Sequence, residues 1–187
     1  MITDIVIVVA AALLVGVYVS WRAGRIDRLH ARVEMARVAL DVTLLRRSEI
    51  ALELATSGLL DPATSLLLAS AVHATRPGVV PPEEKKPRDL AESDLTRALR
   101  AAFSQPGFRP SLTGKDGADE LLTELEAAAH QVFLARKFYN DMVAATRDAR
   151  RRPLARLLHL SGKARAPEFF EMDDSLVADK APAGLGL

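Results

Sequence analysis

The chain has 187 residues, of which 49% are hydrophobic and 5% aromatic, and its formal net charge at pH 7 is +1. A charge so close to neutral gives no electrostatic reason to expect nucleic-acid binding. The chain contains no cysteine, which excludes disulfides, thiolate metal sites and cysteine nucleophiles within it. The small share of aromatic residues favours helix, and the length leaves room for one domain beside an apolar N-terminal segment.

Residues 5–21 read IVIVVAAALLVGVYVSW and contain no charged side chain. As a helix this stretch would span roughly 25 Å, close to a hydrocarbon core of about 30 Å. A cleaved signal peptide is the alternative, and it requires basic residues before the apolar run and small residues after it. Asp4 precedes the run, however, and Trp21 and Arg22 follow where small residues would be needed. We therefore predict an uncleaved transmembrane anchor over residues 1–21.

Arginines recur at helical spacing immediately after the apolar run. They are Arg22, Arg25, Arg28 and Arg32. The positive-inside rule places the remaining chain in the cytoplasm and the short N-terminus outside. Basic residues at this position also attract anionic lipid at about 1 kcal/mol each, although fixing the topology is a sufficient explanation for them. The sequence thus predicts a single-pass protein of the plasma (inner) membrane.

The first helix is expected to continue beyond the span, without a break, to about Ser57. Its inward stripe is Ile26, Leu29, Val33, Ala36, Leu40, Leu44 or Leu45, Ile50 and Leu54. Arg46 and Arg47 interrupt the apolar face near its middle. The commoner arrangement has their aliphatic stems on the protein and their guanidinium groups in solvent. The alternative has one arginine paired with a carboxylate inside the bundle.

Two shorter helices are predicted in the middle of the chain. Asp61 and Pro62 are a typical cap and first-turn pair, which predicts a helix over residues 62–75. Residues 77–89 contain four prolines and are expected to form a loop. A third helix is expected over residues 90–104, with Leu95, Leu99 and either Ala102 or Phe103 facing inward, followed by a Gly- and Pro-rich turn over residues 105–117.

The longest uninterrupted helical pattern covers residues 118–152, with acidic residues early and arginines late, as the helix dipole favours. Its stripe is Leu121, Leu125, Ala128, Val132, Ala135, Tyr139, Met142 and Thr146. A stripe this long needs partner helices to cover it. The predicted fold is therefore all-α: the anchor, then an antiparallel helical bundle of three to four helices over residues 22–171. A short amphipathic helix is expected at residues 154–160 and a disordered tail over residues 172–187.

Residues 135–141 (ARKFYND) resemble a signature near the end of the last bundle helix of LemA-family proteins. The resemblance extends to residues 153–158 (PLARLL) and to residues 166–171 (APEFFE), which are similar to the family's Pro-aromatic-Glu element. Further upstream, the residues similar to the family's first helix after the membrane are Arg32-Val33-Glu34, Asp41-Val42 and Arg46-Arg47. LemA-family proteins are described as membrane-anchored helical bundles of poorly defined function. The resemblance therefore implies an architecture and no chemistry.

The sequence predicts no catalytic residue, cofactor or metal site. A di-iron bundle needs Glu-x-x-His pairs with further inward glutamates, and these are missing. There is no Gly-x-Ser-x-Gly elbow, and residues 112–117 lack the spaced glycine and the hydroxyl residue of a P-loop. Among the four histidines only His130 has a carboxylate at helical spacing, Glu126. The small residues around His130 give partial support to histidine phosphotransfer.

We therefore expect a non-enzymatic, membrane-tethered scaffold or protein-interaction module of the bacterial cell envelope, assembling with itself or with another membrane or cytoplasmic protein. The alternative is a phosphotransfer or other regulatory signalling module acting through His130. One polar network is predicted, in which Asp41 or Arg47 of the first helix meets Arg136, Tyr139 or Asn140 of the longest one. Such contacts would fix the register of the two helices, whereas side chains pointing to solvent would instead form an external binding face.

Overall fold

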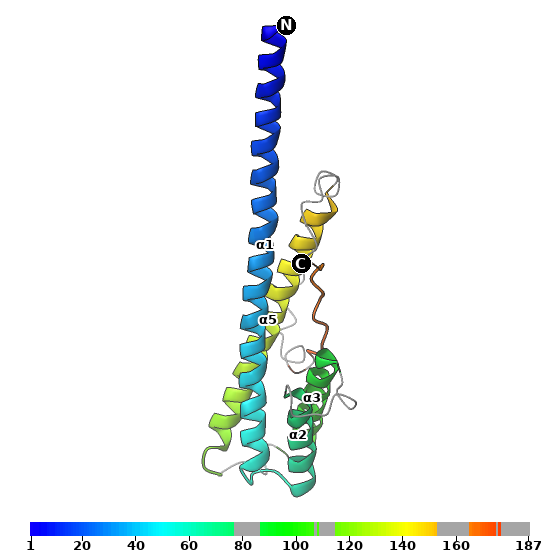
Figure 1. The fold of residues 1–187 in the computed structure, drawn as a ribbon. Helices are drawn as coiled ribbons and strands as arrows, with labels where there is room; N and C mark the ends of the chain where they lie inside the picture. The colour runs from blue at the N-terminus through cyan, green and yellow to red at the C-terminus, as the bar shows by residue number, and fades with distance from the viewer. Residues whose placement is uncertain (77–86, 107, 109–114, 153–164, 175, 177–187) are drawn as a thin grey trace, which may run out of the picture. The chain divides into compact units, whose positions relative to one another are not determined.

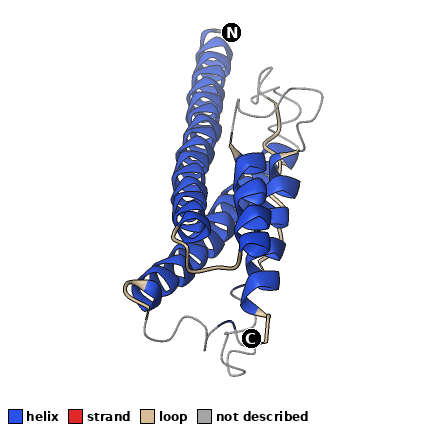
Figure 2. Ribbon diagram, turned by 90° about the horizontal axis from the view of Figure 1, so that it is seen from below, coloured by secondary structure: helices blue, strands red, loops and turns tan. Residues whose placement is uncertain are grey.

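The computed structural model describes residues 1–76, 87–106, 108, 115–152, 165–174 and 176, except for the side chains of Arg22, Ala23 and Ile26. These residues form helices and contain no strand (Figures 1 and 2). The helices are α1 (Ile2–Thr56), α2 (Pro62–Thr75), α3 (Arg88–Phe103) and α5 (Ala118–Arg151). The prediction of an all-α protein is confirmed for this part of the chain.

α1 runs for 55 residues without interruption, as the sequence predicted. Its first 20 residues, Ile2–Trp21, are long and apolar enough to cross a membrane, and none of them is buried against the protein. Gly24 does not break the helix. After Thr56 the chain turns at Gly58, whose φ of 73° is a left-handed conformation that glycine adopts without steric cost.

Contacts divide the chain into two compact units. The first consists of Met1–Val38 and Phe138–Phe169, and the second of Ala39–Lys137 and Phe170–Leu187. α1 and α5 each contribute a stretch to both units, whereas α2 and α3 belong only to the second. This division differs from the predicted one, which placed an anchor beside a single body over residues 22–171, because it follows packing rather than the change in polarity at Trp21.

The hydrophobic core of the second unit draws residues from all four of its helices. It consists of Ile50, Ala51, Leu54 and Ala55 of α1, Leu68 and Val72 of α2, Leu95, Ala98 and Leu99 of α3, and Leu121, Leu125 and Ala128 of α5. On α1 the predicted inward positions from Val33 to Leu54 are buried, with Leu44 rather than Leu45, whereas Leu29 is half-buried and the side chain of Ile26 lies outside the described residues. On α3 Leu95 and Leu99 are buried, with Ala102 rather than Phe103. On α5, six of the eight stripe residues are buried, and Ala135 and Met142 are half-buried.

α2 begins and ends where the sequence predicted. Oδ1 of Asp61 accepts hydrogen bonds from the backbone amides of Ala63, at 3.0 Å, and Thr64, at 3.1 Å. Hydrogen bonding to Thr64 holds the pKa of Asp61 below its usual value. α2 packs against α3. α3 starts at Arg88, two residues before the predicted position, since Pro87 can occupy the cap and Asp89 suits the first turn.

Several predictions concern residues outside the described ranges. They are most of the proline-rich loop (residues 77–86), most of the turn before α5 (residues 107 and 109–114), the short helix at residues 154–160, and the end of the tail (residues 177–187).

Candidate functional site

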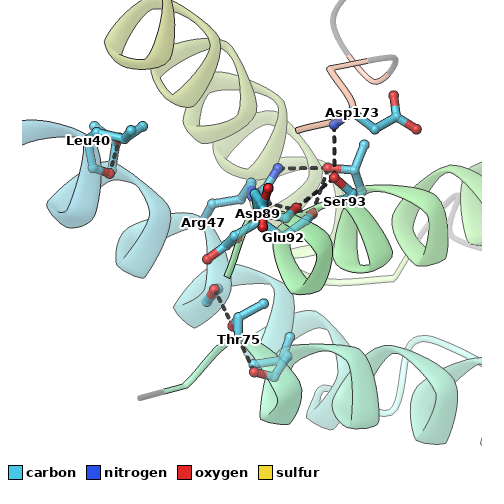
Figure 3. Close-up of polar contacts among 11 residues, drawn as sticks. Leu40, Arg47, Thr75, Asp89, Glu92, Ser93 and Asp173 are labelled. Atoms are coloured by element: carbon cyan, nitrogen blue, oxygen red, sulfur yellow. Dashed lines mark hydrogen bonds and ion pairs between the residues drawn. The ribbon is translucent and has the colours of Figure 1, made fainter. Parts of the chain in front are cut away.

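An arginine and a glutamate form a buried ion pair in the second unit (Figure 3). Arg47 of α1 and Glu92 of α3 have side chains that are each 2% exposed, and Nη2 of Arg47 lies 2.7 Å from Oε2 of Glu92. The same Nη2 donates to the backbone carbonyl of Glu92 at 3.3 Å, and Nη1 donates to the hydroxyl of Thr96 at 3.0 Å. The guanidinium group is therefore held by three acceptors on one turn of α3, while its Nε has no hydrogen-bond partner in the described part of the chain.

Burial raises the pKa of the Glu92 carboxyl, because loss of solvent disfavours the carboxylate more than the neighbouring Arg47 and Arg88 favour it. Removing either side chain would leave the charge of the other buried without a counter-charge. This costs more free energy than replacing both residues by an apolar pair of similar shape. The pair thus makes α1 and α3 mutually dependent at this position. It is a contact that specifies how the two helices pair.

Polar contacts join α1 to each of the other helices of the second unit. Nη1 of Arg88 lies 2.7 Å from Oδ1 of Asp41, in a partly exposed ion pair between α3 and α1. The buried hydroxyls of Ser48 on α1 and Thr75 on α2 are 3.1 Å apart. α1 and α5 are joined at the surface by an ion pair, Arg46 with Glu124. Together with the Arg47–Glu92 pair, these contacts fix the register of α1 within the unit.

Of the two arrangements considered for the adjacent arginines, exposure to solvent holds for Arg46, whereas Arg47 adopts the alternative and pairs with a buried carboxylate. Arg47 follows Leu40 by seven residues and Val33 by fourteen, and both of these are buried. Seven residues are close to two helical turns, so all three point the same way. Arg46 lies about 100° around the helix and is more than half exposed.

The C-terminal segment adds acidic groups to the second unit. The backbone amide of Asp173 donates to the hydroxyl of Ser93 at 3.1 Å (Figure 3). The Asp173 carboxylate lies 3.9 Å from a guanidinium nitrogen of Arg100. Asp174 forms an ion pair with Arg136 of α5, and both side chains are largely buried. These contacts attach residues 173–174 to α3 and to α5.

The predicted disordered tail is consequently wrong at its start. Met172 and Asp174 are half-buried, and Leu176 packs against the hydrophobic core. The composition of residues 172–187 suggested disorder, but two aspartates near its beginning meet arginines on helices that are distant in sequence. Composition alone does not reveal such pairs.

In the first unit, the Pro-aromatic-Glu element lies along the helix that carries the ARKFYND motif. The hydroxyl of Tyr139 donates to the backbone carbonyl of Glu168 at 2.8 Å. Nε of Arg147 donates to the carbonyl of Pro167 at 2.8 Å, and its guanidinium carbon lies 4.6 Å from the centroid of the Phe169 ring. Residues 167–169 are therefore held against α5 by contacts with Tyr139 and Arg147.

The predicted network between the first and longest helices is not formed as expected. Asp41 and Arg47 pair with α3, whereas Arg136 and Tyr139 bond to the C-terminal segment. Asn140 is half-buried on the same helix. The prediction paired α1 directly with α5 and left out α3 and the C-terminal segment, which supply the partners of Asp41, Arg47, Arg136 and Tyr139.

Three of the four arginines that follow the apolar stretch lie at the surface of the first unit. Arg25, Arg28 and Arg32 are exposed, and with Trp21 and Leu29 they line a shallow groove on α1. The side chain of Arg22 lies outside the described residues. A tryptophan beside guanidinium groups is a combination typical of the level of lipid headgroups.

His130 is exposed on α5, with its ring centroid 6.3 Å from that of Phe133. A phosphoacceptor must be exposed, but so is any solvated histidine on a helix surface, so this placement does not favour the phosphotransfer alternative. Within the described ranges, no three His, Asp or Glu side chains are grouped so that they could hold a metal ion.

Glu92, Asp173 and Asp174 were not singled out from the sequence. For Glu92 a signal was present, because it precedes Leu95, Leu99 and Ala102 at steps of three, four and three and therefore lies on the buried face of α3. For the two aspartates no local signal existed. No family model, no curated protein and no solved structure matches this chain.

Proposed function

We propose that this chain is a non-enzymatic protein-interaction module tethered to the bacterial plasma membrane by the first part of α1, with its remaining helices forming an antiparallel bundle in the cytoplasm. The resemblance of residues 135–141 and 166–171 to the LemA family supports this architecture, and the contacts that hold residues 167–169 against α5 are consistent with a shared structural element.

The observation that carries the proposal is the continuity of α1. An exposed apolar stretch of 20 residues, about 30 Å long as a helix, continues without a break into the helix that makes the buried contacts of the second unit. The arginines that follow it favour a cytoplasmic body. A helix of this kind joins a membrane anchor directly to residues that pack within the protein.

The contacts of the second unit support an antiparallel bundle. Asp41 pairs with Arg88, and six residues later Arg47 pairs with Glu92, so α1 and α3 run in the same direction. The short connection from α1 to α2 reverses the chain between them. α1, α2 and α3 thus alternate in direction, as consecutive helices of a bundle do.

Labelling of single cysteines tests the orientation, because the natural chain has none. A membrane-impermeant maleimide added to intact spheroplasts should label Thr3→Cys and leave Asp116→Cys unlabelled until the membrane is opened. Both positions are exposed on the protein, so burial does not explain a difference. Labelling of Asp116→Cys in sealed spheroplasts would refute the cytoplasmic placement.

The interaction function is tested by the mass of the protein extracted in a mild detergent, measured by light scattering with the detergent contribution subtracted. An interaction module should elute as a complex heavier than the 20.3 kDa chain. A protein that elutes only as the monomer, at concentrations comparable to those in the membrane, would contradict this part of the proposal.

A further inference from the structure

Four large apolar side chains form an exposed seam on α1. Met35, Val38, Val42 and Leu45 are between 52% and 65% exposed. They follow one another at steps of three, four and three, so they line one side of the helix. Val33 and Leu40 lie on the opposite side and are buried. Single exposed apolar residues need no explanation, but a continuous row of them does.

The spacing of the seam is that of a coiled coil. With Met35 and Val42 at the a positions of a heptad, Val38 and Leu45 occupy the d positions, and Ala31 is the preceding d. The f positions, which face away from a coiled-coil partner, are Val33, Leu40 and Arg47, and these face the protein's own interior. One face of α1 therefore packs within the chain while the opposite face remains available.

The two edges of the seam carry opposite charges. One edge, at the g positions, carries the acidic residues Asp27, Glu34 and Asp41. The other edge, at the e positions, carries the basic residues Arg25, Arg32 and Arg46. In a parallel pair of helices, g of one faces the e position five residues later on the other, which matches Asp27 with Arg32 and Asp41 with Arg46. In an antiparallel pair g faces g and e faces e, so that like charges would meet.

Anchoring in one membrane also favours a parallel arrangement of two α1 helices. Two copies anchored by their N-terminal helices in one membrane have their α1 helices parallel. Confinement to the bilayer also raises their effective concentration, which helps a seam of only two heptads to pair. We propose that the seam of α1 pairs with the seam of a second copy of this chain in a parallel coiled coil next to the membrane. This inference rests on the proposed tethering and identifies the partner.

Asp27 and Arg32 are the most diagnostic charges. Both are exposed, and neither forms an ion pair in the described part of its own chain. Asp41 and Arg46, in contrast, already pair with Arg88 and Glu124 of the same chain. A change at the first two positions therefore affects contacts between copies without disturbing the contacts that hold the second unit together.

Cysteine crosslinking in native membranes tests the proposal with the full chain. Val38→Cys should form an oxidised dimer at least about fivefold more efficiently than Arg37→Cys. Arg37 is an exposed neighbour at the same depth from the membrane and lies off the seam, so it measures random collision. Equal crosslinking of the two variants, or crosslinking of Val38→Cys to a different protein, would overturn the pairing of two copies.

Charge exchange in the Val38→Cys background tests the orientation of the pair. Asp27→Arg places like charges opposite each other and should lower the dimer yield about three- to tenfold, and Arg32→Glu should do the same. The combination of the two changes should restore the yield. If the double variant does not regain the dimer yield, the parallel register is excluded. Failure of the pairing can be distinguished from failure of the tethering. A tethered monomer would keep the maleimide pattern of Thr3→Cys and Asp116→Cys but would lose the preferential crosslink.

Discussion

Leu44 and Leu45 are neighbours on α1, yet Leu44 is 0% exposed and Leu45 is 52% exposed. They lie about 100° apart around the helix, Leu44 toward its inner face and Leu45 on its outer face. The inner face joins a hydrophobic core and places Arg47 against Glu92, whereas the outer face carries the exposed seam. Both faces repeat at helical spacing. An apolar stripe on a helix therefore identifies a surface that packs against a partner, and that partner can be within the chain or outside it.

The largest expected effect lies on the inner face. Glu92→Leu should destabilise the protein by about 3–5 kcal/mol, because it leaves the guanidinium of Arg47 buried and unpaired. Chemical unfolding of the full chain in detergent micelles measures this loss. The double variant Arg47→Met with Glu92→Leu should regain most of it, since an apolar pair fills similar space. A double variant as unstable as Glu92→Leu alone would show that the charge is not the cause.

A matched pair of truncations compares the two faces directly. Leu44→Ala should cost about 2–5 kcal/mol of unfolding free energy, because it opens a cavity in a packed region. Leu45→Ala should change the stability of the monomer by less than about 0.5 kcal/mol. The same unfolding measurement, at a protein concentration where the chain is monomeric, gives both numbers. Similar losses would mean that the assigned faces of α1 are wrong.

The Arg47–Glu92 pair also predicts a dependence on pH. The folded-state pKa of Glu92 is above its usual value of 4.5, so protonation favours the folded state. That contribution is fully present below pH 4.5 and is lost as pH rises through the folded-state pKa. In Arg47→Met the pKa of Glu92 should rise further, because the favourable charge is gone. The stability deficit of Arg47→Met relative to the natural chain should therefore shrink as pH falls from about 7 toward 5.

Glu92→Leu serves as the control for this effect. It removes the titrating group and leaves Arg47, which stays charged at every accessible pH. Its deficit relative to the natural chain should not shrink over the same range. If the stability deficits of Arg47→Met and Glu92→Leu change alike with pH, the pH dependence arises from groups other than Glu92.

The smallest expected effect concerns the partly exposed contacts. A double-mutant cycle of Asp41→Asn with Arg88→Gln should give a coupling energy of about 0.2–1 kcal/mol, because solvent screens this pair. The cycle of Asp41→Asn with Arg136→Gln should be additive, since Arg136 pairs with Asp174 instead. A strong coupling in the second cycle would restore the network that the sequence suggested.

The sequence allowed much of the helical structure to be predicted. Periodicity and caps located both ends of α2, α3 and α5, and the C-terminal end of α1, within two residues. The spacing of Leu95 and Leu99 identified the inner face of α3. These features depend on local rules, because the helical period and the Asp61 cap act over a few residues.

The polar contacts were harder to predict. Arg47 and Glu92 are separated by 45 residues, and Arg136 and Asp174 by 38. Which acid meets which arginine depends on how the helices pack, and the sequence alone offered several arrangements. The prediction therefore selected the right residues of α1 but gave them the wrong partners.

The N-terminus of the mature protein shows whether one uncleaved helix joins the membrane to the packed units. Membranes are washed at alkaline pH to remove peripheral proteins, and the retained chain is examined by intact mass and N-terminal sequencing. We expect a chain of about 20.3 kDa that begins at or next to Met1 and remains in the washed membrane. A shorter chain that begins after Trp21 and leaves the membrane would contradict it.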